Sequence, residues 1–160
     1  MSIIPTGVGA AGYTMPLPET DDLHMTKGKM LQNIMVALGG RIAEEIIFDD
    51  ITTGASQDIK QATAIARSMV TEYGMSDEVG MINYGGDSSE VFIGRDLAHA
   101  RAYGEEVASK IDREVKNIID DCHEKAKKII LEHEDVLHKC CDLLMEKEKI
   151  GQSEFEALFS

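Results

Sequence analysis

A turn of small side chains at residues 52–58 ends in an acid that could do chemistry. Residues 52–55 are Thr-Thr-Gly-Ala, Ser56 is a suitable N-cap, and Asp58 falls in the first turn of the helix that we expect to follow. A carboxylate placed in this way can bind a metal ion or orient a ligand. The plainer interpretation stays open, because the helix dipole favours an acid in a first turn without any catalytic role.

Two further acids, Glu44 and Glu45, lie on the preceding predicted helix just after a pair of glycines. Helical rotation brings Glu45 to the edge of the apolar stripe, so it could point towards a site, although most helical glutamates face solvent. Gly39 and Gly40 each cost about 1 kcal/mol relative to Ala in a helix interior. We therefore expect another helix to approach closely there, and self-association or repacking if that groove is left open.

The histidines do not form a zinc-binding pair. His133 and His138 flank an acidic stretch that resembles the zinc-protease signature H-E-x-x-H, but they are five residues apart rather than four. Five residues rotate the second imidazole by about 140° from the first, so we interpret this segment as a solvated helix start. The other histidines have no suitably spaced partner: His24, His99, and His123, whose fourth following residue is Lys127.

The periodicity predicts a mainly α protein, a helical bundle with a small β-sheet near the N-terminus. Helices are expected from Thr26 to the loop at 49–55, at 57–73, at 105–131 and, after a polar break at 132–135, to about 149, with a last turn or two at 153–159. Short strands are expected at 2–4, 13–15, 81–84 and 91–93. The predicted buried stripes are Met30, Ile34, Leu38, Ile42 and Ile46; Ile59, Ala62, Ala66, Met69 and Tyr73; and Val107, Ile111, Val115, Ile118, Ile119, Cys122 and Ala126.

We expect one domain over residues 1–160 with three parts. These are a β-rich segment at 1–22, two helices with the Asp-bearing turn at 26–74, and C-terminal helices at 105–160. The size and the 43% hydrophobic content suffice for a core.

Composition excludes several classes of protein. A net charge of −13 argues against a general nucleic-acid binder, because phosphates would be repelled by the protein's own field. No apolar run approaches the length of a membrane span, and the start lacks the features of a signal peptide. Three cysteines, two of them sequence neighbours, suit a reducing compartment. We expect a soluble, cytoplasmic chain.

Six segments in order resemble the protease domain of FtsH, the membrane-anchored AAA+ zinc metalloprotease. They are residues 2–5 (Ser-Ile-Ile-Pro), 12–18, 38–45 (Leu-Gly-Gly-Arg-Ile-Ala-Glu-Glu), 52–58, 69–76 and 91–95. The resemblance implies that Asp58 is the third zinc ligand. In that family an H-E-x-x-H helix upstream of the Ser-Ile-Ile-Pro strand supplies two His ligands and the general base. We expect that helix to be absent from this chain, together with the ATPase module that uses ATP and Mg²⁺ and the N-terminal membrane segments.

Further roles follow from the same resemblance. Glu44 and Glu45 become candidates for supporting the zinc ligand. The substrate cleft is expected to be bordered by Ser2, Ile3, Ile4, Tyr13, Thr14 and Met15. The complete enzyme is expected to be a homohexamer on the cytoplasmic face of a membrane, acting on unfolded or membrane polypeptides. With Asp58 as its one ligand, this chain alone is expected to hold no zinc and to cleave nothing. The alternative is a non-catalytic acidic helical module that serves assembly through helix 105–131 and the helix that carries Cys140.

Overall fold

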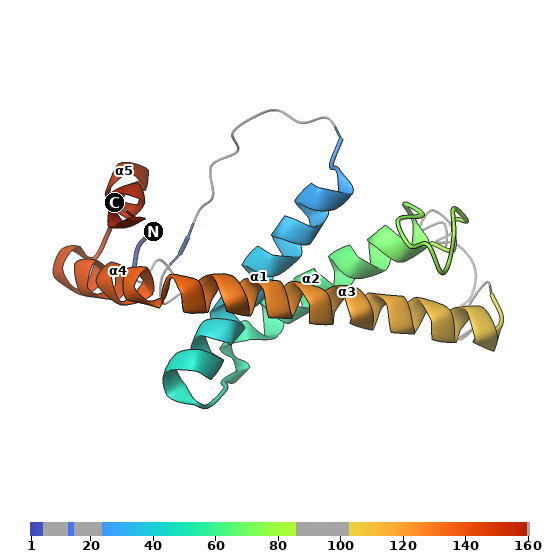
Figure 1. Cartoon of the computed structure of the whole chain (residues 1–160), viewed down its shortest axis with the longest axis horizontal. Coiled ribbons are helices and arrows are strands. Elements are labelled where there is room, and N and C mark those ends of the chain that lie inside the picture. The colour runs from blue at the N-terminus through green and yellow to red at the C-terminus, as the bar shows by residue number, and fades with distance from the viewer. Residues whose placement is uncertain (5–12, 15–23, 86–102, 160) are drawn as a thin grey trace, which may run out of the picture. The chain divides into compact units, whose positions relative to one another are not determined.

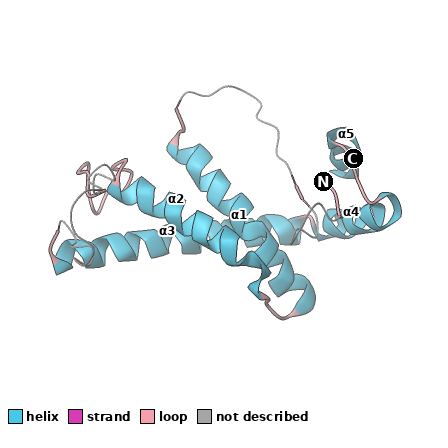
Figure 2. Ribbon diagram, turned by 180° about the vertical axis from the view of Figure 1, so that it is seen from behind, coloured by secondary structure: helices cyan, strands magenta, loops and turns pink. Residues whose placement is uncertain are grey.

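The structure is a computed structural model that describes residues 1–4, 13–14, 24–85 and 103–159. Within these residues the regular structure consists of five α-helices and two 3-10 turns. Figures 1 and 2 show the helices from opposite sides. The elements are α1 (Lys27–Phe48), η1 (Thr53–Ala55), α2 (Ser56–Thr71), α3 (Glu105–Glu132), α4 (Glu134–Lys147), α5 (Gln152–Glu156) and η2 (Ala157–Phe159). The prediction of a mainly α protein is confirmed.

The described residues contain no β-strand. Where a small N-terminal sheet was expected, two isolated antiparallel bridges join Ser2 to Tyr13 and Ser2 to Lys149. The residues between Ser2 and Tyr13 that would have to extend the pairing fall mostly outside the described part. The expected strand at 81–84 is irregular backbone, held at its end by the Tyr84 N–H, which donates to the Thr71 carbonyl at 2.7 Å. The expected strand at 91–93 and Met15 lie outside the described residues.

Helix α1 begins and packs as its sequence predicts. The Thr26 hydroxyl accepts a hydrogen bond from the Lys29 N–H at 3.2 Å, which satisfies one of the free donors of the first turn. Residues that recur every four positions form the buried stripe, namely Met30, Ile34, Leu38 and Ile42, while Ile46 is half-buried. Helix α1 packs against α2, the next helix in the chain (Figure 1).

Helix α2 buries a face of small and flexible side chains, Ala62, Ala66, Met69 and Val70. Two residues predicted for this face are more exposed. Tyr73 is 56% exposed, because α2 ends at Thr71 and the chain has already left the helix, and Ile59 in the first turn is 38% exposed. The predicted N-cap is shifted by one residue, since Ala55 rather than Ser56 stands at that position.

The turn after α2 depends on a glycine. Gly74 has φ +59°, the left-handed conformation that the sequence predicted for it, and the following Met75 N–H donates to the Met69 carbonyl at 2.9 Å. A Cβ built on Gly74 would lie 2.9 Å from the Cα of Met81, closer than such contacts normally come. The chain therefore turns back over its own backbone at this position.

Helix α3 ends within one residue of its predicted end and presents a buried stripe of Ala108, Ile111, Val115, Cys122 and Ala126. Polar contacts accompany this stripe. The buried Ser76 hydroxyl donates to Glu114 at 2.6 Å, and Arg67 pairs with Asp112 at 3.6 Å. These contacts connect α3 with α2 and with the turn that follows α2.

The chain separates into two compact units, residues 24–128 and residues 1–23 with 129–160. The second unit holds α4, which starts after the break at His133, and the short α5. Its N-terminal residues pair with its C-terminal ones, since the Ile150 N–H donates to the Met1 carbonyl at 3.1 Å. No helix in the described part of the chain is long and apolar enough to cross a membrane.

Candidate functional site around Asp58

Asp58 stands in the first turn of α2 with an exposed side chain. The N-terminal end of a helix carries a partial positive charge that favours a carboxylate there. Among the described residues the Asp58 side chain makes no hydrogen bond or ion pair, so its oxygens are free to bind a ligand. The structure thus places this carboxylate where the sequence predicted it.

The start of α2 has no side-chain cap of its own. Ala55 occupies the N-cap position, and its methyl side chain cannot accept a hydrogen bond. The short turn η1 precedes it, and the Ser56 N–H donates back to the Thr53 carbonyl. The turn η1 therefore leads directly into a helix start that has no side-chain cap.

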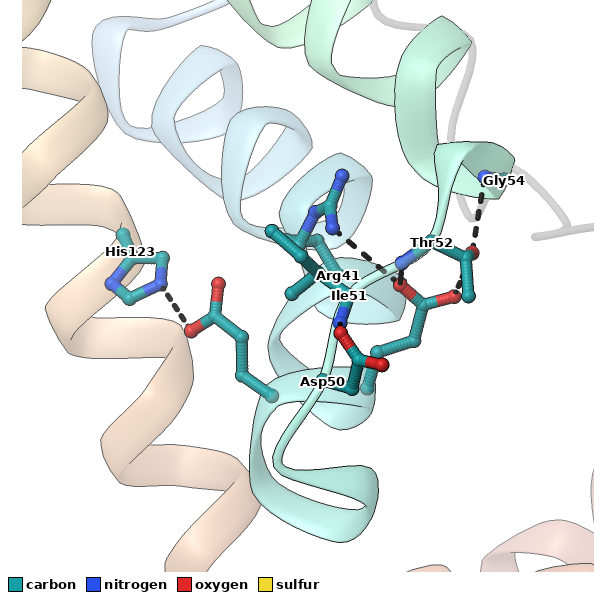
Figure 3. A network of polar contacts seen from close by, with 8 residues as sticks. Arg41, Asp50, Ile51, Thr52, Gly54 and His123 are labelled. Carbon is teal, nitrogen blue, oxygen red and sulfur yellow. Dashed lines mark hydrogen bonds and ion pairs between the residues drawn. The ribbon is translucent and has the colours of Figure 1, made fainter.

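Glu44 of α1 holds the residue before η1 with both of its carboxylate oxygens (Figure 3). Its Oε1 accepts from the Thr52 hydroxyl at 2.7 Å, and its Oε2 accepts from the Thr52 N–H at 3.1 Å. The same hydroxyl accepts from the Gly54 N–H at 3.1 Å. We call this arrangement of Glu44, Thr52 and Gly54 the turn clamp.

Arg41 completes the surroundings of the Glu44 carboxylate. Its Nη1 lies 3.7 Å from Glu44 Oε2, with 15% of the Arg41 side chain and 23% of the Glu44 side chain exposed. This buried Nη1 has no hydrogen-bond partner within the described part of the chain. Its positive charge therefore acts on Glu44 through space, at a distance longer than a hydrogen bond.

The environment of Glu44 favours its charged form. The pKa of its carboxyl is lowered from the usual 4.5, first by the hydrogen bond from the Thr52 hydroxyl, then by the bond from the Thr52 N–H. Attraction by Arg41 lowers it further, whereas partial burial and the nearby Asp50 raise it. The carboxylate is therefore an acceptor for two donors at neutral pH.

The clamp leaves little room at Gly54. A Cβ added there would lie 3.2 Å from the Thr52 Oγ1 and 3.9 Å from Glu44 Oε1. A larger residue at position 54 would therefore push against the clamp.

Glu45, the next residue, turns to a different element. Its Oε2 lies 3.2 Å from Nε2 of His123 on α3, and both side chains are about two-thirds buried. Adjacent residues on a helix point about 100° apart, so neighbouring acids can contact different elements. Glu44 thus contacts Thr52, just before η1, and Glu45 contacts His123 of α3. Figure 3 labels both partners, Thr52 and His123.

The N-terminal candidates lie in the other unit. Ser2 is buried, and its backbone pairs with Tyr13 on one side, while the Ile3 N–H donates to the Glu148 carbonyl at 3.0 Å on the other. Ile3, Ile4 and Tyr13 are about two-fifths exposed, and Thr14 is exposed. Ser2 is therefore a covered position, and the backbone N–H and C=O of Tyr13 are both paired with it, whereas Thr14 is exposed.

The described residues hold no group of three or more His, Cys, Asp or Glu side chains arranged for a metal ion. His133 is the N-cap residue of α4, and its ring packs edge-to-face on Phe159 with centroids 5.5 Å apart. His138 lies 3.8 Å from Glu134 in its own helix. Both residues belong to a different unit from Asp58.

Sequence reasoning missed three members of this network: Arg41, Thr52 as the partner of Glu44, and His123 as the partner of Glu45. Thr52 was treated as a small turn residue, although a Thr eight positions after a helical Glu, across a chain reversal, could have suggested the contact. The pairing of Glu45 with His123 spans 78 positions and leaves no local signal.

Comparison with known proteins connects these observations. The profile of peptidase family M41 matches residues 1–158. The chain is 51% identical over 158 residues to the ATP-dependent zinc metalloprotease FtsH of Caldicellulosiruptor bescii, which covers 99% of this chain and 26% of that protein. It is 50% identical to FtsH 1 of a Thermoanaerobacter species and 46% identical to FtsH of Thermotoga maritima, in each case over the whole chain and 26% of the relative.

The chain thus spans about a quarter of the length of these curated relatives. Asp58, the turn clamp and α1 with its two acids all fall inside the matched region. The length of the match and the level of identity leave no ambiguity about ancestry. This chain belongs to peptidase family M41.

Proposed function

We propose that this chain contributes one carboxylate ligand, Asp58, to the catalytic zinc of an ATP-dependent endopeptidase. The observation that carries the proposal is the exposed, unpaired Asp58 at the start of α2, within a region matched end to end by a metalloprotease family. The relatives named above are zinc metalloproteases. An oxygen ligand of this kind is one of the types that Zn²⁺ accepts.

The described residues do not fit a complete zinc site. Zinc needs about four ligands, and Asp58 would supply one of them. The described residues hold no group of three or more His, Cys, Asp or Glu side chains that could supply a fuller set. The two remaining protein ligands, both histidines, would then come from polypeptide outside these 160 residues, and so would the general base. The 160-residue chain alone is inactive under this proposal.

The wider setting rests on resemblance to the family. The complete enzyme would be a membrane-anchored homohexamer with an ATPase module that uses ATP and Mg²⁺, and it would act on unfolded or membrane polypeptides at the cytoplasmic face. Residues 1–160 would form one peptidase domain. An extended substrate would pass along the segment that includes Tyr13 and Thr14, and Glu44 and Glu45 would support the region of Asp58.

The first experiment measures zinc and cleavage in the chain itself. The purified 160-residue chain is loaded with Zn²⁺, dialysed and assayed on unfolded casein, with Asp58→Asn in parallel. We expect less than about a tenth of a zinc per chain and no cleavage. Stoichiometric zinc that Asp58→Asn abolishes, together with cleavage, would show that the chain completes a site by itself and would refute the proposed division of ligands.

The second experiment supplies the rest of an enzyme. The 158 matched residues of the Caldicellulosiruptor bescii FtsH are replaced by those of this chain, and ATP-dependent casein cleavage by the chimera is measured. Asp58→Asn should reduce both bound zinc and cleavage by at least about a hundredfold, whereas Asp121→Asn, a change to another exposed helical carboxylate, should not. A chimera that cleaves equally well with Asp58→Asn would favour the non-catalytic assembly module instead.

A further inference from the structure

We propose that Glu44 positions the start of α2 from the neighbouring helix, taking the place of the cap that α2 lacks. The inference concerns how Asp58 is presented, so its functional part rests on the proposed function above. Glu44 does not touch Asp58. It acts through Thr52, and it is a positioning residue rather than a catalytic one.

The geometry of the turn clamp carries the proposal. Two donors of one residue, the Thr52 N–H and its hydroxyl, meet two different oxygens of Glu44 at 3.1 and 2.7 Å. Two contacts to one residue fix its orientation, which a single contact would leave free to rotate. The Thr52 hydroxyl also holds Gly54, because its oxygen accepts a hydrogen bond from the Gly54 N–H at 3.1 Å.

The clamp lies directly before a helix start that has no side-chain cap. A helix begins with N–H groups that lack partners inside the helix, and a Ser, Thr, Asp or Asn at the N-cap normally accepts from one of them. Ala55 cannot do so. Gly54, the last residue held by the clamp, lies just before Ala55, and Asp58 follows four residues after Gly54.

The pattern of donors also explains why a carboxylate is needed at position 44. Both Thr52 groups donate, and the two oxygens of an ionised carboxylate accept from both of them. A glutamine has one oxygen for the Thr52 N–H, and its NH₂ group would then have to donate to a hydroxyl oxygen that already accepts from the Gly54 N–H. Glu44→Gln therefore reverses one contact and replaces two charge-assisted hydrogen bonds by neutral ones, with little change of volume.

The structural test uses the 160-residue chain and NMR. Amide exchange of Thr52 and Gly54 is measured in the wild type and in Glu44→Gln. The matched control is Glu45→Gln, because it removes a charge from the next residue of the same helix but faces His123 instead. We expect Glu44→Gln to speed exchange of both amides by about tenfold and Glu45→Gln to leave them unchanged.

Variants of the partner separate positioning from general loss of stability. Thr52→Val removes the hydroxyl and with it one of the two contacts to Glu44, so it should also speed exchange, and the effects of Thr52→Val and Glu44→Gln should be less than additive in the double variant. Thr52→Ser keeps both donors and should retain wild-type exchange. Unchanged exchange in Glu44→Gln, or equal changes in Glu44→Gln and Glu45→Gln, would overturn the proposal.

The functional test uses the chimera. Glu44→Gln and Thr52→Val should lower kcat about ten- to a hundredfold with KM within about twofold, and Thr52→Ser should restore kcat. Faster exchange with an unchanged kcat would overturn the positioning role. If Asp58→Asn leaves the chimera active, the proposed function fails instead, and the exchange data alone then decide whether Glu44 holds the turn.

Discussion

Replacing the two glycines in the middle of α1 should stabilise this chain. A Cβ added to Gly39 or Gly40 meets nothing within 4 Å in the described part of the chain, so neither alanine would clash there. Each Gly→Ala change inside a helix is worth about 1 kcal/mol. The double variant should therefore gain about 2 kcal/mol, which for a chain of this size raises Tm by roughly 4–8 °C.

The assay is thermal unfolding followed by circular dichroism at several protein concentrations. The close helix approach that these glycines predict is not made by any described residue, and Val36, one turn earlier, is 73% exposed. A Tm lowered by the alanines would refute the reasoning, because it would mean that they clash with something. A gain in Tm that disappears as the chain is concentrated would also refute it, because it would mean that a second copy covers this surface. If the same alanines reduce cleavage by the chimera, another part of the complete enzyme packs there.

Three further outcomes follow from other features. Gly74→Ala should cost roughly 2–4 kcal/mol in urea unfolding, because it adds left-handed strain and a contact with Met81 backbone at 2.9 Å. The stabilising contribution of Glu44, whose pKa is lowered, should be present above about pH 4.5 and lost as the pH falls through the lowered value, so wild type and Thr52→Val should converge in unfolding midpoint at acid pH. Cys141, the exposed cysteine, should react with iodoacetamide well before the two buried cysteines.

Each of these predictions has its own check. Gly80→Ala is the control for Gly74→Ala, because Gly80 also has a positive φ of 79° but open space around its Cβ, so it should cost clearly less. Equal costs would show that the Met81 contact relaxes. A difference between wild type and Thr52→Val that does not shrink as the pH is lowered below the range in which Glu44 is ionised would contradict the role of the carboxylate. Burial raises the pKa of Cys122 and Cys140, and peptide mapping that found either one alkylated first would show that the core opens.

The sequence predicted those parts of the fold that depend on local periodicity. A repeat of four in α1 identified Met30, Ile34, Leu38 and Ile42 as buried, because a helix turns once in 3.6 residues and such residues share a face. Thr26 was correctly identified as the cap and Gly74 as the left-handed residue, since each of these needs a particular residue type.

The sequence was less informative where the outcome depends on tertiary contacts. The N-cap of α2 was misplaced by one residue, because the clamp from Glu44 allows Ala55 to stand where a polar residue would normally be needed. A small sheet was expected from apolar residues near the N-terminus, and the described part has two bridges around Ser2 instead. For the site, the position of Asp58 was predictable from the turn before it, but its role as a ligand remains a prediction.

The spacing of the two glutamate contacts along the chain has a consequence for the order of folding. Glu44 and Thr52 are separated by eight residues, whereas Glu45 and His123 are separated by 78. Closing the short loop costs little chain entropy, so α1, the turn and α2 should form a hairpin early, and α3 should dock in a slower, later step. During synthesis the hairpin would also leave the ribosome before α3 is made, so the chain that carries Asp58 can be shaped before its last helices exist.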